Sequence, residues 1–519
     1  MKAQTVTTPR QSSYERPREN FEHIVGYLDS GEASAMSHSE LERELEKRGR
    51  ELMRILLQEH LDNRGPGQCD QPVQGVDGVE RPLVRLQERK LETVFGTVSV
   101  ERAGYGQEAT ESLHPLDAEL NLPNERYSLE LRRRVAEEAA KSSFDETQES
   151  IGKTTGGHVP KRQIEELVKR AARDFDAFYQ RRHGQSAEAE ATGSVLVISV
   201  DGKGVVMRTQ DLREQTRKAA EARAHKMGTR LSKGEKKNAK RMATVATVYT
   251  IAPFVRTPQD LVDEASCALA RTPRPKPEKK RVWASLEKTP EQVIEDALAE
   301  AIHRDPAGEK TWAALVDGNK TQIRELRQMA RKNGLNLTII VDIIHVIEYL
   351  WAAGRAFHPE PGPELESWVR HRLLEVLRGK AGLMAGGMRR SATRRGLSPG
   401  AREPVDTCAR YLRNHSAYLR YDGYLAQGLP IATGVIEGAC RHLVKDRMDV
   451  TGARWSLTGA EAVLRLRALR SSHDFDEYWV FHETREYERT HQALYAGGIV
   501  PSTTASLPAR KRAHLRVIK

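Results

Sequence analysis

The sequence is poor in the features that mark three large protein classes. Its four cysteines are spread over 519 residues, which excludes a dense disulfide framework and a paired zinc-ligand motif. The longest apolar stretches, such as residues 195–198 and 337–341, are far shorter than the ~18 residues of a membrane span. No apolar segment of a secretory signal follows the N-terminus. We therefore expect the reducing environment of the cytoplasm.

Aromatic residues are also scarce, whereas charge is abundant. Aromatics make up 6% of the chain and charged residues 30%. The 83 Lys and Arg exceed the 72 Asp and Glu, which leaves a net charge of +11. A basic balance permits a polyanionic partner without proving one. A chain of this length is expected to form two to four domains.

The N-terminal part is expected to be mainly helical. Residues 1 to about 20 are polar and contain Pro and Arg, and the N-terminus is predicted to be disordered over residues 1–36. Apolar residues at helical spacing predict a helix over residues 40–61, and alternation over residues 91–103 predicts a strand or hairpin.

Three helical patterns follow within residues 127–179, and a connection with two glycines precedes the third. This order is compatible with a helix-turn-helix in which Lys161, Arg162 and Gln163 begin a DNA-facing helix. A helical bundle with a solvated third helix explains the same pattern.

From residue 193 the pattern changes to alternating strands and helices. Strands are predicted at residues 194–200, 205–207, 241–255, 312–316 and 335–341, and helices at 291–302, 320–332 and 343–356. This order favours an α/β core with some parallel pairing. Residues 359–429 are predicted to be a helical insertion, and residues 434–448 and 457–469 to be helices.

Three aspartates follow predicted strands. Asp201, Asp317 and Asp342 each come directly after an apolar run. A residue directly after a strand lies at the edge of the sheet where the strands' carboxyl ends meet, and open α/β sheets usually bind their ligands at that edge. Hard cations such as Mg²⁺ prefer clustered carboxylates, and two such ions can assist phosphoryl transfer. Taken singly, Asp201 is also explained by a turn between strands and Asp317 by a helix cap.

Two further elements add to this candidate site. Glu437 lies on a predicted helix, and Arg441 and Lys445 follow at four and eight residues, on the same helical face. This spacing suits a metal ligand with phosphate contacts, or an ordinary first-turn acid that pairs with Arg441. His345 follows Asp342 by three residues, as a possible metal partner or a structural histidine.

Other candidate DNA contacts lie outside this acidic set. Residues 212–241 contain 11 Lys and Arg against 3 acids, and Lys236 and Lys237 belong to this segment. A solvated loop explains it equally well. Trp455 could stack on an unpaired base, although a buried tryptophan is the commoner case.

Five segments together resemble the ISKra group of bacterial insertion-sequence transposases. They are SVDGKGVVMR, LVDGN, VDIIHVIEYLW, GLPIATGVIEGACRHLVKDRMD and TGARWSLTGAEAVLRLRALR. The resemblance runs from about residue 91 to residue 482, with HPLDAELNLP in its N-terminal part. It implies a DDE transposase with a ribonuclease H-like mixed sheet and a helical insertion.

The resemblance also implies roles for individual residues. Asp201, Asp317 and Glu437 match the metal-binding triad for Mg²⁺, with Mn²⁺ as a substitute. Asp342 and His345 match an accompanying acid and histidine, and Asp342 is the alternative second metal ligand.

The implied activity is cleavage at the ends of a mobile element and joining of the 3′-hydroxyl ends to target DNA. The implied partners are the terminal inverted repeats and target DNA, bound by a homodimer or higher oligomer. Two other functions stay open: a catalytically inactive, transposase-derived DNA-binding protein, and a carboxylate-pair hydrolase of a small substrate.

The expected organisation has six parts. They are a disordered N-terminus (1–36), a DNA-binding region (37–185), a first part of the catalytic core (190–357), a helical insertion (358–429), a second part of the core (430–470) and a helical, basic tail (471–519).

Overall fold

The structure is a computed structural model that describes residues 14–185, 192–222, 239–262, 273–450 and 452–503. The chain divides into two compact units, Met1–Asp174 with Asp476–Lys519, and Phe175–Phe475. Within the described ranges, no helix combines the length and apolar character needed to cross a bilayer. The first unit joins both ends of the chain, and the second contains the acids singled out by the sequence.

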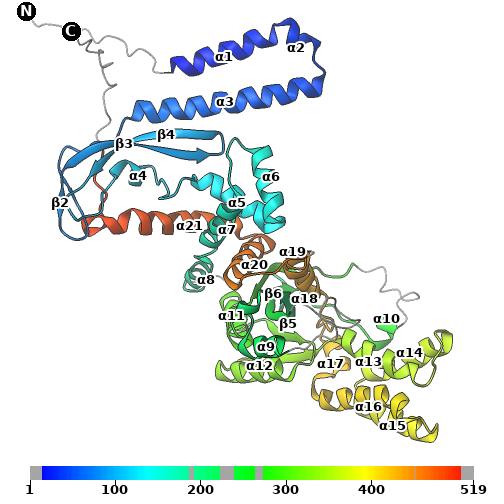
Figure 1. The fold of residues 1–519 in the computed structure, drawn as a ribbon. Coiled ribbons are helices and arrows are strands. Elements are labelled where there is room, and N and C mark those ends of the chain that lie inside the picture. Colours follow the sequence, from blue (N-terminus) through cyan, green and yellow to red (C-terminus); the bar gives the residue numbers. More distant parts are fainter. Residues whose placement is uncertain (1–13, 186–191, 223–238, 263–272, 451, 504–519) are drawn as a thin grey trace, which may run out of the picture. The chain divides into compact units, whose positions relative to one another are not determined.

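The first unit begins with helices where disorder was predicted. Helices α1 (Glu15–Leu28) and α2 (Gly31–Ala35) precede the long α3 (His38–Arg64) (Figure 1). The prediction of disorder over 1–36 is therefore wrong for its described part. Arg16 pairs with Glu59 at 2.7 Å and with Asp62 at 2.6 Å. These partners lie on α3, so local composition could not reveal them.

A β-hairpin and a group of helices complete the first unit. Strands β3 (Leu83–Thr93) and β4 (Gly96–Tyr105) pair antiparallel, which confirms the predicted hairpin and lengthens it. Tyr478 on the C-terminal helix donates a hydrogen bond to the carbonyl of Ala171 at 2.5 Å. The remaining elements are β1 (Val73–Gln74), β2 (Glu80–Arg81), α4 (Pro115–Glu119), α5 (Leu129–Lys141), α6 (Phe144–Thr154), α7 (Lys161–Ala171) and α21 (Phe475–Thr490).

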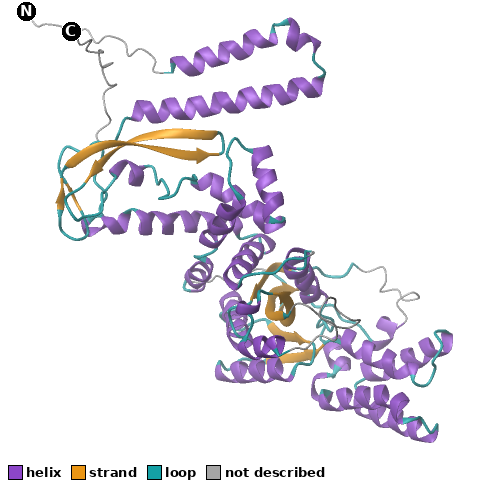
Figure 2. Cartoon of the chain, in the orientation of Figure 1, coloured by secondary structure: helices purple, strands orange, loops and turns teal. Residues whose placement is uncertain are grey.

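The second unit is built on a five-stranded mixed sheet in the order β7-β6-β5-β8-β9. Figure 2 draws its strands in orange, with purple helices around them. Strand β5 pairs antiparallel with β6, and β6 pairs antiparallel with β7. On its other side β5 pairs parallel with β8, and β8 pairs parallel with β9. The predicted α/β class with partly parallel pairing is thus confirmed. The strands are β5 (Val195–Val206), β6 (Lys240–Ile251), β7 (Glu278–Ser285), β8 (Thr311–Val316) and β9 (Leu337–Val341).

Two strand predictions need correction. The segments 194–200 and 205–207 form one strand, β5, which pairs with β6 residue by residue from Val195 to Val206. Asp201 therefore lies within a strand, and Asp201-Gly202 is not a turn. Strand β7 was missed because its first four residues, 278–281, are all charged and follow a stretch rich in Pro and Arg, so that no apolar run marks where it begins.

Helices pack around this sheet and extend from it. Helices α11, α18 and α20 contact its strands, and α14, α15 and α16 form the predicted helical insertion. The helices of this unit are α8 (Phe175–His183), α9 (Glu214–Glu221), α10 (Pro258–Val262), α11 (Pro290–Arg304), α12 (Lys320–Lys332), α13 (Ile343–Arg355), α14 (Pro363–Leu377), α15 (Ala381–Arg394), α16 (Pro399–Asn414), α17 (Tyr421–Ala426), α18 (Gly434–Ala439), α19 (Asp446–Met448) and α20 (Leu457–Ser471).

Candidate active site

The strand register brings the three aspartates to the same level of the sheet. Ser199 of β5 pairs with Leu315 of β8, and Val316 of β8 pairs with Val341 of β9. Continuing these parallel registers places Asp317 beside Asp201 and Asp342 beside Asp317. Neighbouring strands lie about 4.8 Å apart, so the three backbone positions span roughly 10 Å.

Asp342 is the most buried of the three and is held by four hydrogen bonds. Its side chain is 0% exposed. One carboxylate oxygen accepts from the amides of Ile344 and Thr433, both at 3.1 Å. The other accepts from the Thr433 hydroxyl at 2.7 Å and lies 3.0 Å from Nδ1 of His345. Burial opposes ionisation, but these donors prevail and hold the pKa of Asp342 below its usual value.

His345 is the cationic partner of this carboxylate. Its hydrogen bond to Asp342 raises the pKa of His345 to about 9, with further contributions from the charges of Asp342, Glu348 and Asp317. The ring is therefore protonated at neutral pH. A charge-assisted pair of this kind fixes Asp342 in place and occupies one of its oxygens.

Glu437 is connected to the same network through Thr433. The Thr433 hydroxyl lies 3.2 Å from a carboxylate oxygen of Glu437, one turn further along α18. Glu437 itself is exposed. Thr433 is thus positioned between the buried Asp342 and the exposed Glu437, and it brings the helix start to the carboxyl edge of the sheet.

Cys440 connects the same helical segment to Asp201. Its thiol donates to a carboxylate oxygen of Asp201 at 3.3 Å, and it follows Glu437 by three residues. Burial, followed by the charge of Asp201, raises the pKa of Cys440, so the thiol keeps its proton. Asp201 and Glu437 therefore lie on the same side of the sheet.

The helix becomes π-helical at this point, over Cys440–Lys445. Such segments are rare and are often found at functional sites. The expected shared face of Glu437, Arg441 and Lys445 assumed α-helical spacing throughout, and the π-helical turns break that spacing. Arg441 lies 3.9 Å from Asp446, and both Arg441 and Lys445 are exposed.

The loop after β8 is held by the helical insertion. Tyr411 donates to the carbonyl of Asp317 at 2.9 Å, and Nε2 of His415 lies 2.9 Å from the carbonyl of Gly318. Gly318 has a φ of +97°, and a Cβ there would lie 2.9 Å from the Tyr411 hydroxyl. Asp317 also accepts from the amide of Asn319 at 2.8 Å, and Asn319 caps α12. Asp317 itself is therefore not the helix cap.

The donor set at this edge fits a divalent cation. Among the described residues, no Lys or Arg forms an ion pair with Asp201, Asp317 or Glu437, although ion pairs are common elsewhere in the chain. Three carboxylates without a cationic partner suit Mg²⁺, whose preferred ligands are oxygens. Their ligand atoms do not all lie within 4.8 Å of one another. The acids are thus gathered at one edge without forming a closed ligand sphere.

The candidate DNA contacts differ in their placement. Lys161, Arg162 and Gln163 are exposed at the start of α7, where Lys161 pairs with Asp145 at 2.6 Å. Lys236 and Lys237 lie outside the described residues.

Trp455 is buried, with 7% of its surface exposed. Its indole nitrogen donates to the carbonyl of Met448 at 3.1 Å. The proposed stacking of Trp455 on a base is therefore wrong, because both its ring and its donor are engaged inside the protein.

Sequence reasoning missed four residues of this site: Thr433, Cys440, Tyr411 and His415. Thr433 and Cys440 lie four residues before and three after Glu437, so helical spacing from Glu437 could have found them. Tyr411 and His415 are more than ninety residues from Asp317 and carry no such signal.

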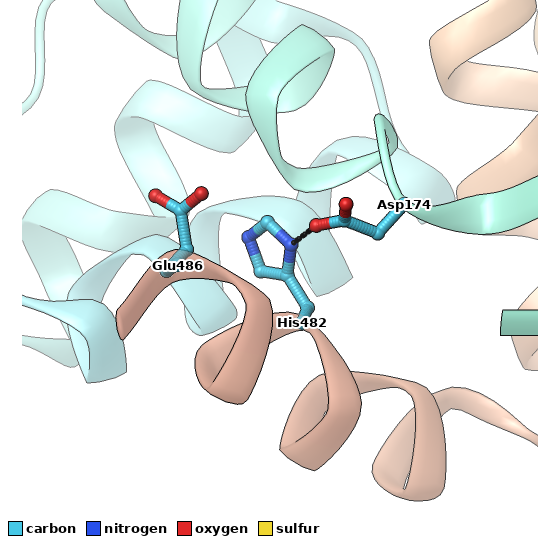
Figure 3. Close-up of side chains that lie close together, drawn as sticks. All are labelled: Asp174, His482 and Glu486. Atoms are coloured by element: carbon cyan, nitrogen blue, oxygen red, sulfur yellow. Dashed lines mark hydrogen bonds and ion pairs between the residues drawn. The ribbon is translucent and has the colours of Figure 1, made fainter. Parts of the chain in front are cut away.

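A second cluster of potential ligands lies in the first unit. Asp174, His482 and Glu486 are buried, and their ligand atoms lie within 4.8 Å of one another (Figure 3). Nδ1 of His482 is 2.7 Å from Asp174. Arg489, however, contacts Asp174 at 2.6 and 2.7 Å and Glu486 at 2.6 Å. Because this guanidinium already occupies both acids, we interpret the cluster as a structural ion-pair network.

Comparisons with known proteins give little beyond this geometry. No protein-family model and no curated protein matches the chain. Among solved structures, a chain of the Drosophila P element transposase strand transfer complex is similar over 70% of this chain and 89% of that chain, at 9% identity and a TM-score of 0.18. A likeness this low carries no argument about fold or activity.

Proposed function

We propose that this protein is a metal-dependent DNA transposase of the DDE type, with a ribonuclease H-like core. The observation that supports this most is the level arrangement of Asp201, Asp317 and Asp342 on β5, β8 and β9, with Glu437 connected to it through Thr433. Along the chain, Asp201 lies on the first strand of this sheet, Asp317 follows the fourth, and Glu437 lies on a helix after the fifth, which are the positions that the resemblance to DDE transposases implies.

In this proposal Asp201, Asp317 and Glu437 hold Mg²⁺. Bound there, a pair of such ions would supply Lewis-acid chemistry for attack on a phosphodiester and for departure of its leaving oxygen. Asp342 is a positioning residue, because its four hydrogen bonds leave its oxygens engaged. It orients Thr433, and with it the start of the helix that carries Glu437.

The other residues keep the site in one geometry. The Cys440 thiol donates a hydrogen bond to Asp201 and thereby fixes one carboxylate oxygen. Tyr411 and His415 hold the backbone that carries Asp317. Preorganised carboxylates reduce the rearrangement needed when metal and substrate bind.

The first test measures metal binding and cleavage separately. Mn²⁺ binding can be measured by electron paramagnetic resonance. We expect it to weaken in Asp201→Asn, Asp317→Asn and Glu437→Gln. The same changes should lower the rate of Mg²⁺-dependent nicking of supercoiled plasmid by roughly 10³-fold. Glu403→Gln, which changes an exposed acid of α16, is the matched control and should retain both properties.

The second test concerns DNA affinity. Glu437→Gln should retain most of it, because affinity depends mainly on phosphate contacts made by Lys and Arg. DNA binding by a parent protein that neither binds Mn²⁺ nor cleaves would favour the inactive, transposase-derived alternative. Metal-independent hydrolysis of a small substrate would favour the hydrolase.

A further inference from the structure

A basic groove lies beside the candidate active site and is not part of the metal-binding set. It has a volume of about 930 Å³ and is lined by α12, by the last residue of α16 and by His415 and Tyr418 after it. Helix α12 contains five Lys and Arg and one acid. The acid, Glu325, is mostly buried and pairs with Arg324 at 2.8 Å. The groove is therefore strongly positive.

The cations of α12 are regularly placed. Lys320, Arg324, Arg327 and Arg331 recur at intervals of three or four residues, which puts them on one helical face. All four are exposed. At about 1.5 Å per residue, this row is roughly 16 Å long. One DNA strand has about one phosphate per 3.4 Å of axis, so about five phosphates fit along the row.

Most of these cations have no acidic partner. Within the part of the chain that the structure describes, Lys320, Arg327, Arg331 and Lys332 form no ion pair with Asp or Glu. Arg327 donates instead to the Tyr418 hydroxyl at 3.0 Å. Such a row of unneutralised charge is the electrostatic footprint of a polyanion site.

The groove adjoins the loop after β8 that carries Asp317. Helix α12 begins three residues after Asp317, and His415, which lines the groove, contacts the carbonyl of Gly318 at 2.9 Å. An anionic chain bound along α12 would therefore reach the carboxyl edge of the sheet. Among the described residues that line the groove, the aromatic ones are the buried His415 and the half-buried Tyr418, so these residues offer no exposed ring on which unpaired bases could stack.

We propose that this groove binds the phosphate backbone of duplex DNA and guides it to the carboxylates. That the bound DNA is then cleaved rests on the proposed function, whereas DNA binding by the groove does not. Contacts of this kind position the duplex without reading its sequence. Each cation that contacts a phosphate should contribute about 0.9 to the slope of log affinity against log salt concentration.

The test compares two triple variants on a 30-base-pair duplex of arbitrary sequence. Lys320→Ala, Arg327→Ala and Arg331→Ala together should weaken binding roughly 10²-fold at 0.1 M salt and reduce the slope by about 2.7. The control combines Arg390→Ala, Arg394→Ala and Arg410→Ala, three exposed arginines of the insertion. It should change affinity less than threefold.

Several outcomes would overturn the groove. One is a first triple whose affinity for the duplex stays within threefold of the parent's, and another is a loss of affinity no larger than that of the control triple. A third is a first triple that loses more affinity for a single strand or for polyglutamate than for the duplex. If the triple unfolds, Arg331→Ala alone should still lower the slope by about 0.9.

Failure of the groove and failure of the proposed function can be told apart with Asp201→Ala. If the groove triple binds DNA as the parent does, and Mg²⁺-dependent cleavage is lost only in Asp201→Ala, the groove proposal is refuted and the proposed function is supported. If the triple binds DNA more weakly, but the parent protein does not cleave DNA, the groove proposal is supported and the proposed function is refuted.

Discussion

The sharpest prediction separates Asp317 from Asp342 as the second metal ligand. Asp317→Asn should leave folding almost unchanged, because Asn can still accept from the amide of Asn319. Cleavage should fall by roughly 10³-fold, the effect of losing several kcal/mol of charge stabilisation. Asp342→Asn should instead destabilise the second unit.

The magnitude for Asp342 follows from its hydrogen bonds. An amide can accept from Ile344 and Thr433 through its oxygen, but its NH₂ group would face the donors of His345 and of the Thr433 hydroxyl. One lost bond involves a cation, and the site is fully buried. Such a mismatch costs about 3 kcal/mol, and for a unit of this size a fall in the melting temperature of ~5 °C is expected.

The assay follows unfolding by tryptophan fluorescence. Five of the six tryptophans belong to Phe175–Phe475, so the signal reports mainly on the second unit. Mn²⁺ binding is measured in parallel at a temperature at which each variant is folded. Folded Asp342→Asn that has lost Mn²⁺ binding at unchanged stability, with Asp317→Asn still binding, would refute the assignment and make Asp342 the ligand.

Four further predictions follow. Because the pKa of His345 is raised from 6.5 to about 9, its pairing with Asp342 stabilises the fold fully below pH 6.5, and this stabilisation is lost as the pH rises through about 9. The melting temperature of the parent should therefore fall over that interval, and in His345→Asn this fall should be smaller. Gly318→Ala should lower cleavage at least tenfold without unfolding the protein, because a Cβ at φ +97° meets Tyr411; full activity would contradict this. Trp455→Ala should cost about 3–5 kcal/mol in the free energy of unfolding, while DNA affinity of the folded variant stays unchanged, and a selective loss of affinity would restore the stacking role. Arg489→Ala should destabilise the first unit by about 3–5 kcal/mol, whereas EDTA should leave its melting temperature unchanged, and a fall with EDTA would indicate a metal at that cluster.

The sequence by itself determined the local elements and the order of the core. Helix α12 begins and ends where its periodicity predicted, at Lys320 and Lys332, because local spacing and flanking residues define an amphipathic helix. Strands β8 and β9 were predicted by their apolar runs. The acids Asp201, Asp317 and Asp342 were selected from the sequence because each follows a buried apolar run, and Glu437 because it begins a helix with Arg441 and Lys445 at helical spacing.

Tertiary structure decided the rest, for reasons of long-range contact. Helix α1 forms beside α3, and β7 joins β6 despite its basic start, because both gain partners remote in sequence. The register alone sets Asp317 level with Asp201. The roles of the acids also depend on contacts across the fold. Thr433, ninety-one residues from Asp342, supplies two of the four hydrogen bonds to that carboxylate, while Asp317 keeps no cationic partner among the described residues. Spacing along a chain cannot show which side chain will meet another after such a separation, because only the packed sheet and helices bring them together.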